Sequence, residues 1–138
     1  MKKTTDLLNE LTSSTNIDKY IKNNTDSIIN QNLSEHLCQI FDERQISKTK
    51  VVRNSNLNEV YAYQIMSGKR MPSRDKIICL CIGAEFSIED INQTLRIAGY
   101  SPLYPKIVRD SIIIYCIQKE YTVWQINEEL YKRNEETL

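Results

Sequence analysis

Residues 46–73 carry the most informative sequence of the chain, ISKTKVVRNSNLNEVYAYQIMSGKRMPS. Ser47 is placed to cap a short helix that turns its two valines inward. A tight turn follows, in which Asn56 can adopt the left-handed conformation, and Asn58 is then placed to cap a second helix. We therefore expect a helix, a short turn and a second helix.

The same stretch lies within a basic island between acidic flanks. Residues 44–76 contain 8 basic and 2 acidic side chains (net +6), whereas residues 1–43 contain 4 and 7 and residues 77–138 contain 6 and 9 (net −3 each). The asymmetry is local, because 18 Lys and Arg balance 18 Asp and Glu over the 138 residues. A solvated charge run is one interpretation, and a surface for an anion, most commonly nucleic acid, is the other.

Apolar residues recur at helical spacing through most of the chain, and no Asn-Gly or Asp-Gly hairpin signal occurs. This pattern predicts an all-α fold. One helix should span residues 33–44 with Asn32 as its cap. Further helices should begin after Ser73 and Ser87, and Gly99 should end the second of these.

The end of the chain repeats part of itself. Residues 74–103 align with residues 109–138 at a shift of 35 positions, and eleven of the thirty aligned residues are identical. The repeated unit is a helix, a turn with a Ser or Thr cap and a second amphipathic helix, and Thr122 with Gln125 forms a capping box in the second copy. We expect two stacked helical hairpins, although chance similarity between amphipathic helices is an alternative.

The chain accordingly divides into a short-helix extension (1–32), a central domain (33–100) and a C-terminal hairpin (101–138) packed on it. The extension is rich in Asn, Thr and Ser, and Thr5, Asn16 and Thr25 are its expected caps. Because isolated helices of this length are marginal in water, we expect them to dock on the body of the protein or on another chain.

Features of enzymes, metal sites and membrane proteins are scarce. The four cysteines form no Cys-x-x-Cys pair and His36, expected at the surface or boundary, is the only histidine, so we predict no metal and no cofactor. Gly68-Lys69 lacks the earlier glycine and the following hydroxyl of a phosphate-binding loop, and we predict no catalytic residue. No apolar run reaches membrane-spanning length and no signal segment is visible, so we expect a cytoplasmic protein.

Residues 33–98 resemble the lambda-repressor-like helix-turn-helix domain of the Xre and Cro type, a five-helix DNA-binding fold of bacterial and phage repressors. The most specific part is QIMSGKRMPS at 64–73, which looks like the end of the recognition helix, the Gly-Lys-Arg-x-Pro-Ser loop and the start of the fourth helix. Leu57-Asn58 matches the apolar residue and polar cap that open the recognition helix.

By position, the resemblance implies base contacts on the first turns of the second helix, and phosphate contacts at the start of the first helix and in the Gly-Lys-Arg loop. Lys48 suits a phosphate as a point charge. Glu59 can accept a hydrogen bond from cytosine but repels phosphate. The candidate DNA-binding residues are Lys48, Thr49, Arg53, Asn58, Glu59, Tyr61, Gln64, Lys69 and Arg70.

These features lead us to expect a sequence-specific, repressor-like regulator that binds double-stranded DNA. The N- or C-terminal helices would form a homodimer or hold a protein partner. The alternative is a protein interaction module, or an antitoxin-like adaptor, that keeps the fold with reduced or lost DNA binding. Net neutrality, the acidic flanks and Glu59 favour that alternative.

Overall fold

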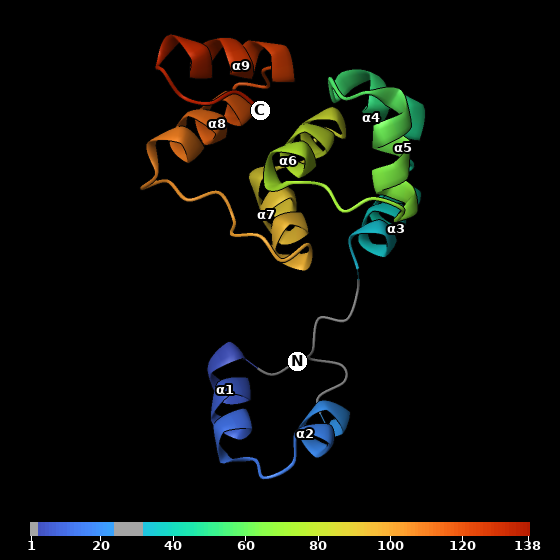
Figure 1. The fold of residues 1–138 in the computed structure, drawn as a ribbon, viewed down its shortest axis with the longest axis vertical. Coiled ribbons are helices and arrows are strands. Elements are labelled where there is room, and N and C mark those ends of the chain that lie inside the picture. Colours follow the sequence, from blue (N-terminus) through green and yellow to red (C-terminus); the bar gives the residue numbers. More distant parts are fainter. Residues whose placement is uncertain (1–2, 24–31) are drawn as a thin grey trace. The chain divides into compact units, whose positions relative to one another are not determined.

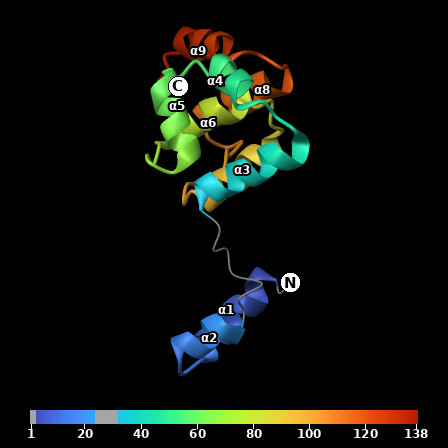
Figure 2. The ribbon, with the colours of Figure 1, turned by 90° about the vertical axis from the view of Figure 1, so that its right-hand side faces the viewer.

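The computed structural model describes residues 3–23 and 32–138 and divides into two compact units, Met1–Asn30 and Gln31–Leu138. Every regular element within the described residues is an α-helix (Figures 1 and 2). The predicted all-α class is therefore confirmed.

The first unit holds two short helices, α1 (Thr4–Ser13) and α2 (Ile17–Asn23), and neither contains a buried residue. Asn16 caps α2 as predicted, because its Oδ1 accepts hydrogen bonds from two backbone N–H groups at 3.0 and 3.2 Å. The expectation for Thr5 is wrong, since this residue lies inside α1 and the helix begins without a side-chain cap. Thr25 lies outside the described residues.

The described part of the second unit forms helices from α3 to α9. In chain order they are α3 (Leu33–Arg44), α4 (Lys48–Asn54), α5 (Glu59–Ser67), α6 (Arg74–Gly83), α7 (Ile88–Ile97), α8 (Val108–Gln118) and α9 (Val123–Lys132). The caps predicted at Asn32, Ser73, Ser87 and Thr122 all accept a hydrogen bond from a backbone N–H in the first turn of their helix. Gly99 follows the end of α7 at a φ of 86°, as a helix-ending glycine does.

Helix α6 lies at the centre of this unit, between the α4–α5 pair and the α8–α9 pair (Figure 1). Its residues from Ile77 to Cys81 are at most 2% exposed. Helices α4, α7 and α9 all contact α6. A helix that is apolar on all sides is stable in water only when neighbours cover every side, which explains why α6 is the core element.

The repeat predicted from the sequence is present in the backbone. Asn92 Oδ1 accepts a hydrogen bond from the N–H of Leu103 at 2.8 Å, and 35 residues later Asn127 Oδ1 accepts one from the N–H of Leu138 at 2.7 Å. The turn inside each hairpin also holds a glutamate in the left-handed conformation, with φ of 59° and 60°. Residues 74–103 and 109–138 therefore form two copies of one helical hairpin.

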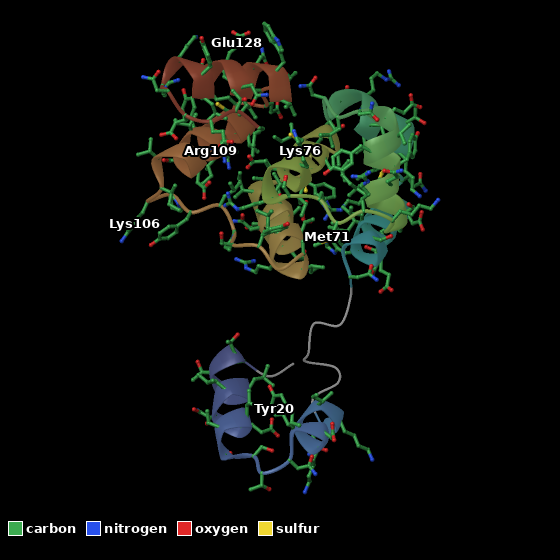
Figure 3. The ribbon with its side chains drawn as sticks, in the orientation of Figure 1. Tyr20, Met71, Lys76, Lys106, Arg109 and Glu128 are labelled. Atoms are coloured by element: carbon green, nitrogen blue, oxygen red, sulfur yellow. The ribbon has the colours of Figure 1, made fainter. Side chains whose placement is uncertain are left out.

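The two hairpins face each other around an internal pseudo-two-fold axis. Arg74 donates to both carboxylate oxygens of Asp110, at 3.1 and 2.9 Å, while Arg109 (Figure 3) donates to both oxygens of Asp75, at 3.0 and 2.9 Å. Helix α6 contacts α9 and, reciprocally, α7 contacts α8. Contacts exchanged in this way define a two-fold interface, which closes on itself, whereas a head-to-tail stack could add further copies.

Gly83 allows α6 to approach α4 more closely than any other residue could. A Cβ atom at this position would lie 2.5 Å from the carbonyl oxygen of Val51 and 2.9 Å from the backbone nitrogen of Ser55. Both atoms belong to the backbone, so neither can rotate away. At Gly99, by contrast, no atom lies within 4 Å of the potential Cβ. This position favours glycine only because its φ is positive.

We expect Gly83→Ala to lower the free energy of unfolding by about 3 kcal/mol, the upper end of the usual cost of overpacking, since the helices must separate or strain. Gly99→Ala should cost only about 1 kcal/mol, the penalty of a left-handed alanine. Urea unfolding followed by circular dichroism compares the two variants. A loss in Gly83→Ala no larger than that in Gly99→Ala would show that α6 and α4 are not in this close contact.

His36 is buried rather than at the surface or boundary, with 3% of its area exposed. Its Nε2 lies 2.9 Å from Thr94 Oγ1, and that hydroxyl donates its own hydrogen to the carbonyl oxygen of Asp90 at 2.8 Å. The hydroxyl can therefore only accept from His36, which places the proton of the neutral ring on Nε2. Burial lowers the pKa of His36 below its usual 6.5, although Asp90 opposes this effect.

This burial predicts a loss of stability in mild acid. As the pH drops below about 6.5, His36 becomes protonated in the unfolded chain, whereas in the folded protein it is protonated only at a lower pH. The free energy of unfolding therefore decreases as the pH is lowered through this window. The slope can reach ~1.4 kcal/mol per pH unit. In His36→Gln, whose amide can still donate to Thr94, we expect a smaller loss between pH 7 and pH 5.5. Equal losses in both proteins would contradict this role of His36.

Candidate nucleic-acid interface

Helices α4 and α5 and the turn between them form the predicted helix, turn and helix. Ser47 Oγ accepts a hydrogen bond from the N–H of Lys50 at 3.4 Å, and Asn58 Oδ1 accepts one from the N–H of Tyr61 at 3.2 Å, so both predicted caps are confirmed. Asn56 has a φ of 60°, the left-handed conformation that the turn requires. These local interactions set where each of the two helices begins.

Packing on the core fixes the orientation of α5. Ala62 and Ile65 are at most 1% exposed. On the outer side, the Thr49 and Tyr63 hydroxyls lie 3.5 Å apart and join α4 to α5. The two helices are thus tied both at the core and at the surface.

The loop after α5 is held close to α3. Gly68 ends α5 at a φ of 86°, and the N–H groups of Lys69 and Arg70 both donate to the carbonyl oxygen of Gln64, at 2.9 and 3.2 Å. A Cβ on Gly68 would lie 3.3 Å from the side chain of Ser34 in α3. The backbone of this loop is therefore ordered while both basic side chains remain exposed.

The structure exposes most of the predicted contact residues. Tyr61 and Gln64 differ from the others because each is half-buried. Tyr61 packs against the core, and the Arg70 guanidinium lies 5.9 Å from the centre of its ring. The exposed residues are Lys48, Thr49, Arg53, Asn58, Glu59, Lys69 and Arg70.

The residues on the outer face of α5 differ in part from the predicted contact residues. Glu59, Val60, Tyr63 and Ser67 are exposed, and at about 100° per residue they share one side of the helix, with Gln64 at its edge. Tyr63 was missing from the candidate residues. The helical spacing of the apolar residues Ala62, Ile65 and Met66 on the opposite side is the sequence signal that could have identified it.

A cleft of about 540 Å³ lies between α4, the turn and α5. It brings together four of the nine predicted residues, and Tyr63 lines it as well. The remaining five predicted residues do not line it. The four are Thr49, Arg53, Asn58 and Glu59.

Some cations of the basic island are paired with carboxylates within the fold, and others have no carboxylate partner in the described part of the chain. Arg44 binds both oxygens of Asp90, at 2.6 and 3.1 Å, and thereby lowers the pKa of that carboxyl. Arg74 is committed to Asp110. Lys50 lies 3.9 Å from Glu85. Among the described residues, those island cations with no carboxylate within 4 Å are Lys48, Arg53, Lys69, Arg70 and Lys76.

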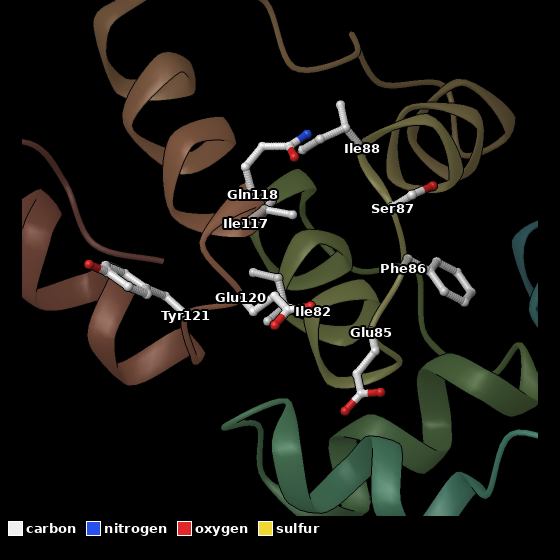
Figure 4. A pocket seen from close by; sticks show the side chains of 9 residues that line it. All are labelled: Ile82, Glu85, Phe86, Ser87, Ile88, Ile117, Gln118, Glu120 and Tyr121. Carbon is white, nitrogen blue, oxygen red and sulfur yellow. The ribbon is translucent and has the colours of Figure 1, made fainter.

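A second cleft, of about 600 Å³, lies between the turns of the two repeated hairpins (Figure 4). Its lining includes repeat pairs such as Ile82 and Ile117, and Glu85 and Glu120, and it contains no basic residue. Figure 4 shows Glu85 pointing towards α4, where Lys50 lies. A lining with two carboxylates and no cation does not suit nucleic acid.

Other chemistry has little support in the described residues. No group of three or more His, Cys, Asp or Glu side chains there is arranged to hold a metal ion. Burial raises the pKa of Cys79 to about 11 and that of Cys81 to about 12, so both thiols stay protonated and unreactive at neutral pH. None of the described helices combines the length and apolar character needed to cross a membrane.

Comparisons of this chain with protein-family models, with curated proteins and with solved structures return no match.

The capping role of Asn58 can be separated from any contact with a ligand. Asn58→Ala should lower the free energy of unfolding by about 1 kcal/mol, because the N–H of Tyr61 loses its acceptor, whereas Asn58→Asp keeps an acceptor and should change it by less than about 0.5 kcal/mol. Asn54→Ala, at an exposed asparagine at the end of α4, is the matched control. Urea unfolding measures all three, and equal stability of the Ala and Asp variants at position 58 would contradict the capping role.

Proposed function

We propose that this chain is a sequence-specific, repressor-like transcriptional regulator that binds double-stranded DNA in the cytoplasm through α4, the turn and α5. In this proposal residues 33–98 form a lambda-repressor-like helix-turn-helix domain. The observation that carries it is the combination of an Asn-capped helix that exposes one face with cations that have no carboxylate partner in the described structure, in the helix before it and in the loop after it.

The cations are placed to supply phosphate contacts. Lys48 and Arg53 lie near the two ends of α4, the helix that precedes α5, and Lys69 and Arg70 lie in the loop that follows α5. All four are exposed. Phosphate contacts of this kind provide affinity and fix the register of a protein on the duplex without reading its sequence.

Base readout is assigned to α5. An α-helix fits the major groove, and the first turns of a recognition helix meet the base edges. Asn58 uses its side-chain oxygen as a cap and keeps its amide hydrogens for an acceptor. Glu59, exposed beside it, can accept from the amino group of cytosine, and Gln64 contributes from the edge of the face.

A protein interaction module, or an antitoxin-like adaptor, is the second candidate, and α9 favours it. Trp124 and Tyr131 are 67% and 78% exposed. At the equivalent positions of the first hairpin the chain has Glu89 and Arg96, so the second copy has exchanged two surface charges for two aromatic side chains. Such residues suit contact with a second copy or another protein, and the same face could serve a DNA-binding dimer.

Binding to selected DNA tests the proposal. Fragments bound by the wild type are recovered from random duplex DNA, and the affinity for the recovered site is measured at several salt concentrations. We expect Lys69→Ala/Arg70→Ala to weaken binding and to reduce the slope of log affinity against log salt by about 1.8, since each phosphate contact contributes about 0.9. Gln64→Ala should instead alter the base preference at one position of the site.

The matched control is Lys106→Ala/Lys119→Ala, which removes the same charge from exposed residues outside the basic island (Lys106 in Figure 3). Its salt slope should equal that of the wild type. Failure of folded wild-type protein to enrich any sequence would refute the regulator and favour the interaction module. If the slope of log affinity against log salt fell equally in both double variants, the binding would depend on overall charge and not on the Lys69 and Arg70 loop.

A further inference from the structure

Val60 is an exposed apolar side chain inside the basic island. It is the second residue of α5, and 65% of its area is accessible. It does not belong to the hydrophobic core or to the residues packed against it. Its neighbours in sequence are the cap Asn58 and Glu59 before it and Tyr61 after it.

Within the described residues, Val60 makes no contribution to the hydrophobic core that would require a valine at this position. Valine is a poorer helix former than alanine, because its branched side chain loses rotamer freedom against the preceding turn. An exposed valine in the first turn therefore gives α5 no gain in helix stability. The side chain is free to serve a contact outside the chain.

The position of Val60 on α5 suits a contact with bases. Val60 and Tyr63 lie near the middle of the exposed side of the helix, between Glu59 and the half-buried Gln64. Tyr63 is held by Thr49 across the cleft, whereas Val60 projects from the first turn beside the capped end of the helix. When the outer face of α5 enters the major groove, Val60 reaches the base edges together with Glu59.

Among the base edges of the major groove, thymine alone presents a methyl group to an apolar side chain. Amino groups and carbonyl or ring-nitrogen acceptors offer a valine no partner and lose water when it covers them. We propose, on the basis of the DNA-binding function above, that Val60 packs against the 5-methyl group of a thymine and so requires that base in the target site.

Replacing thymine by uracil tests this contact directly, because deoxyuridine differs from thymidine only by the missing 5-methyl group. Each thymidine of the selected duplex is replaced in turn by deoxyuridine, and binding is measured for the full-length wild type and for Val60→Ala. At one position we expect the wild type to bind about four-fold more weakly, which corresponds to ~0.8 kcal/mol for one buried methyl-sized group. At that same position Val60→Ala should bind both duplexes equally.

Val108→Ala is the matched control, because Val108 is also 65% exposed at the start of a helix but lies outside the basic island. It should show the same four-fold effect of uracil as the wild type. Since Val60 and Val108 are both on the surface, both variants should unfold at the urea concentration of the wild type or above it.

The results separate this inference from the function on which it rests. The contact is established if uracil at one position of the selected site weakens binding of the wild type and has no effect on binding of Val60→Ala. A selected site at which uracil has no effect, or affects the wild type and Val60→Ala alike, overturns the role of Val60 and leaves the DNA-binding function standing. If no sequence is selected, the DNA-binding function itself fails.

Discussion

The contact between α6 and the backbone of α4 at Gly83 holds the candidate interface in place. The potential Cβ of Gly83 points at Val51 and Ser55, so α6 touches the last turn of α4. Ser55 is fully buried there, and its hydroxyl donates to the carbonyl oxygen of Val52 at 2.8 Å and accepts from the N–H of Leu57 at 3.3 Å. The core helix thereby sets the turn, and the turn sets the direction of α5.

Charge in the basic island is divided between folding and the surface. Arg44 and Arg74 each hold a carboxylate of another element with two hydrogen bonds, and Asp110, the partner of Arg74, has a side chain only 4% exposed. Loss of Arg74 would leave the buried Asp110 carboxylate without its partner, which costs about 3–5 kcal/mol, so Arg74 is needed for the fold. The Arg44 side chain is 48% exposed, and its pair with Asp90 contributes less. The net charge of the island overstates what a nucleic acid could meet, and the relevant cations are those around α5.

The local features of this structure could be predicted from the sequence. Caps such as Ser47, Asn58 and Ser73 are determined by residues within one helical turn, and each lies where its side chain and position predicted. The repeat could be recognised because identical residues recur at a fixed shift. Its pseudo-two-fold arrangement could not, because a shift in sequence carries no information on how two copies face each other.

Features that depend on distant partners could not be predicted. The burial of His36 depends on Thr94, 58 residues away. The half-buried position of Tyr61 depends on the core residues that it packs against, whereas the outward position of Tyr63 follows from helical spacing alone. The need for Gly83 likewise appears only once α4 and α6 are brought together. The DNA contacts themselves stay predictions.

The internal two-fold interface also determines how the protein behaves on dilution. Two separate hairpins that met through the same arginine and aspartate pairs would dissociate as their concentration fell. Here residues 104–108 join them, and a short connection holds tethered partners at an effective concentration on the order of millimolar. The paired hairpins therefore stay assembled even at very low protein concentration. This holds whether or not whole chains associate with one another.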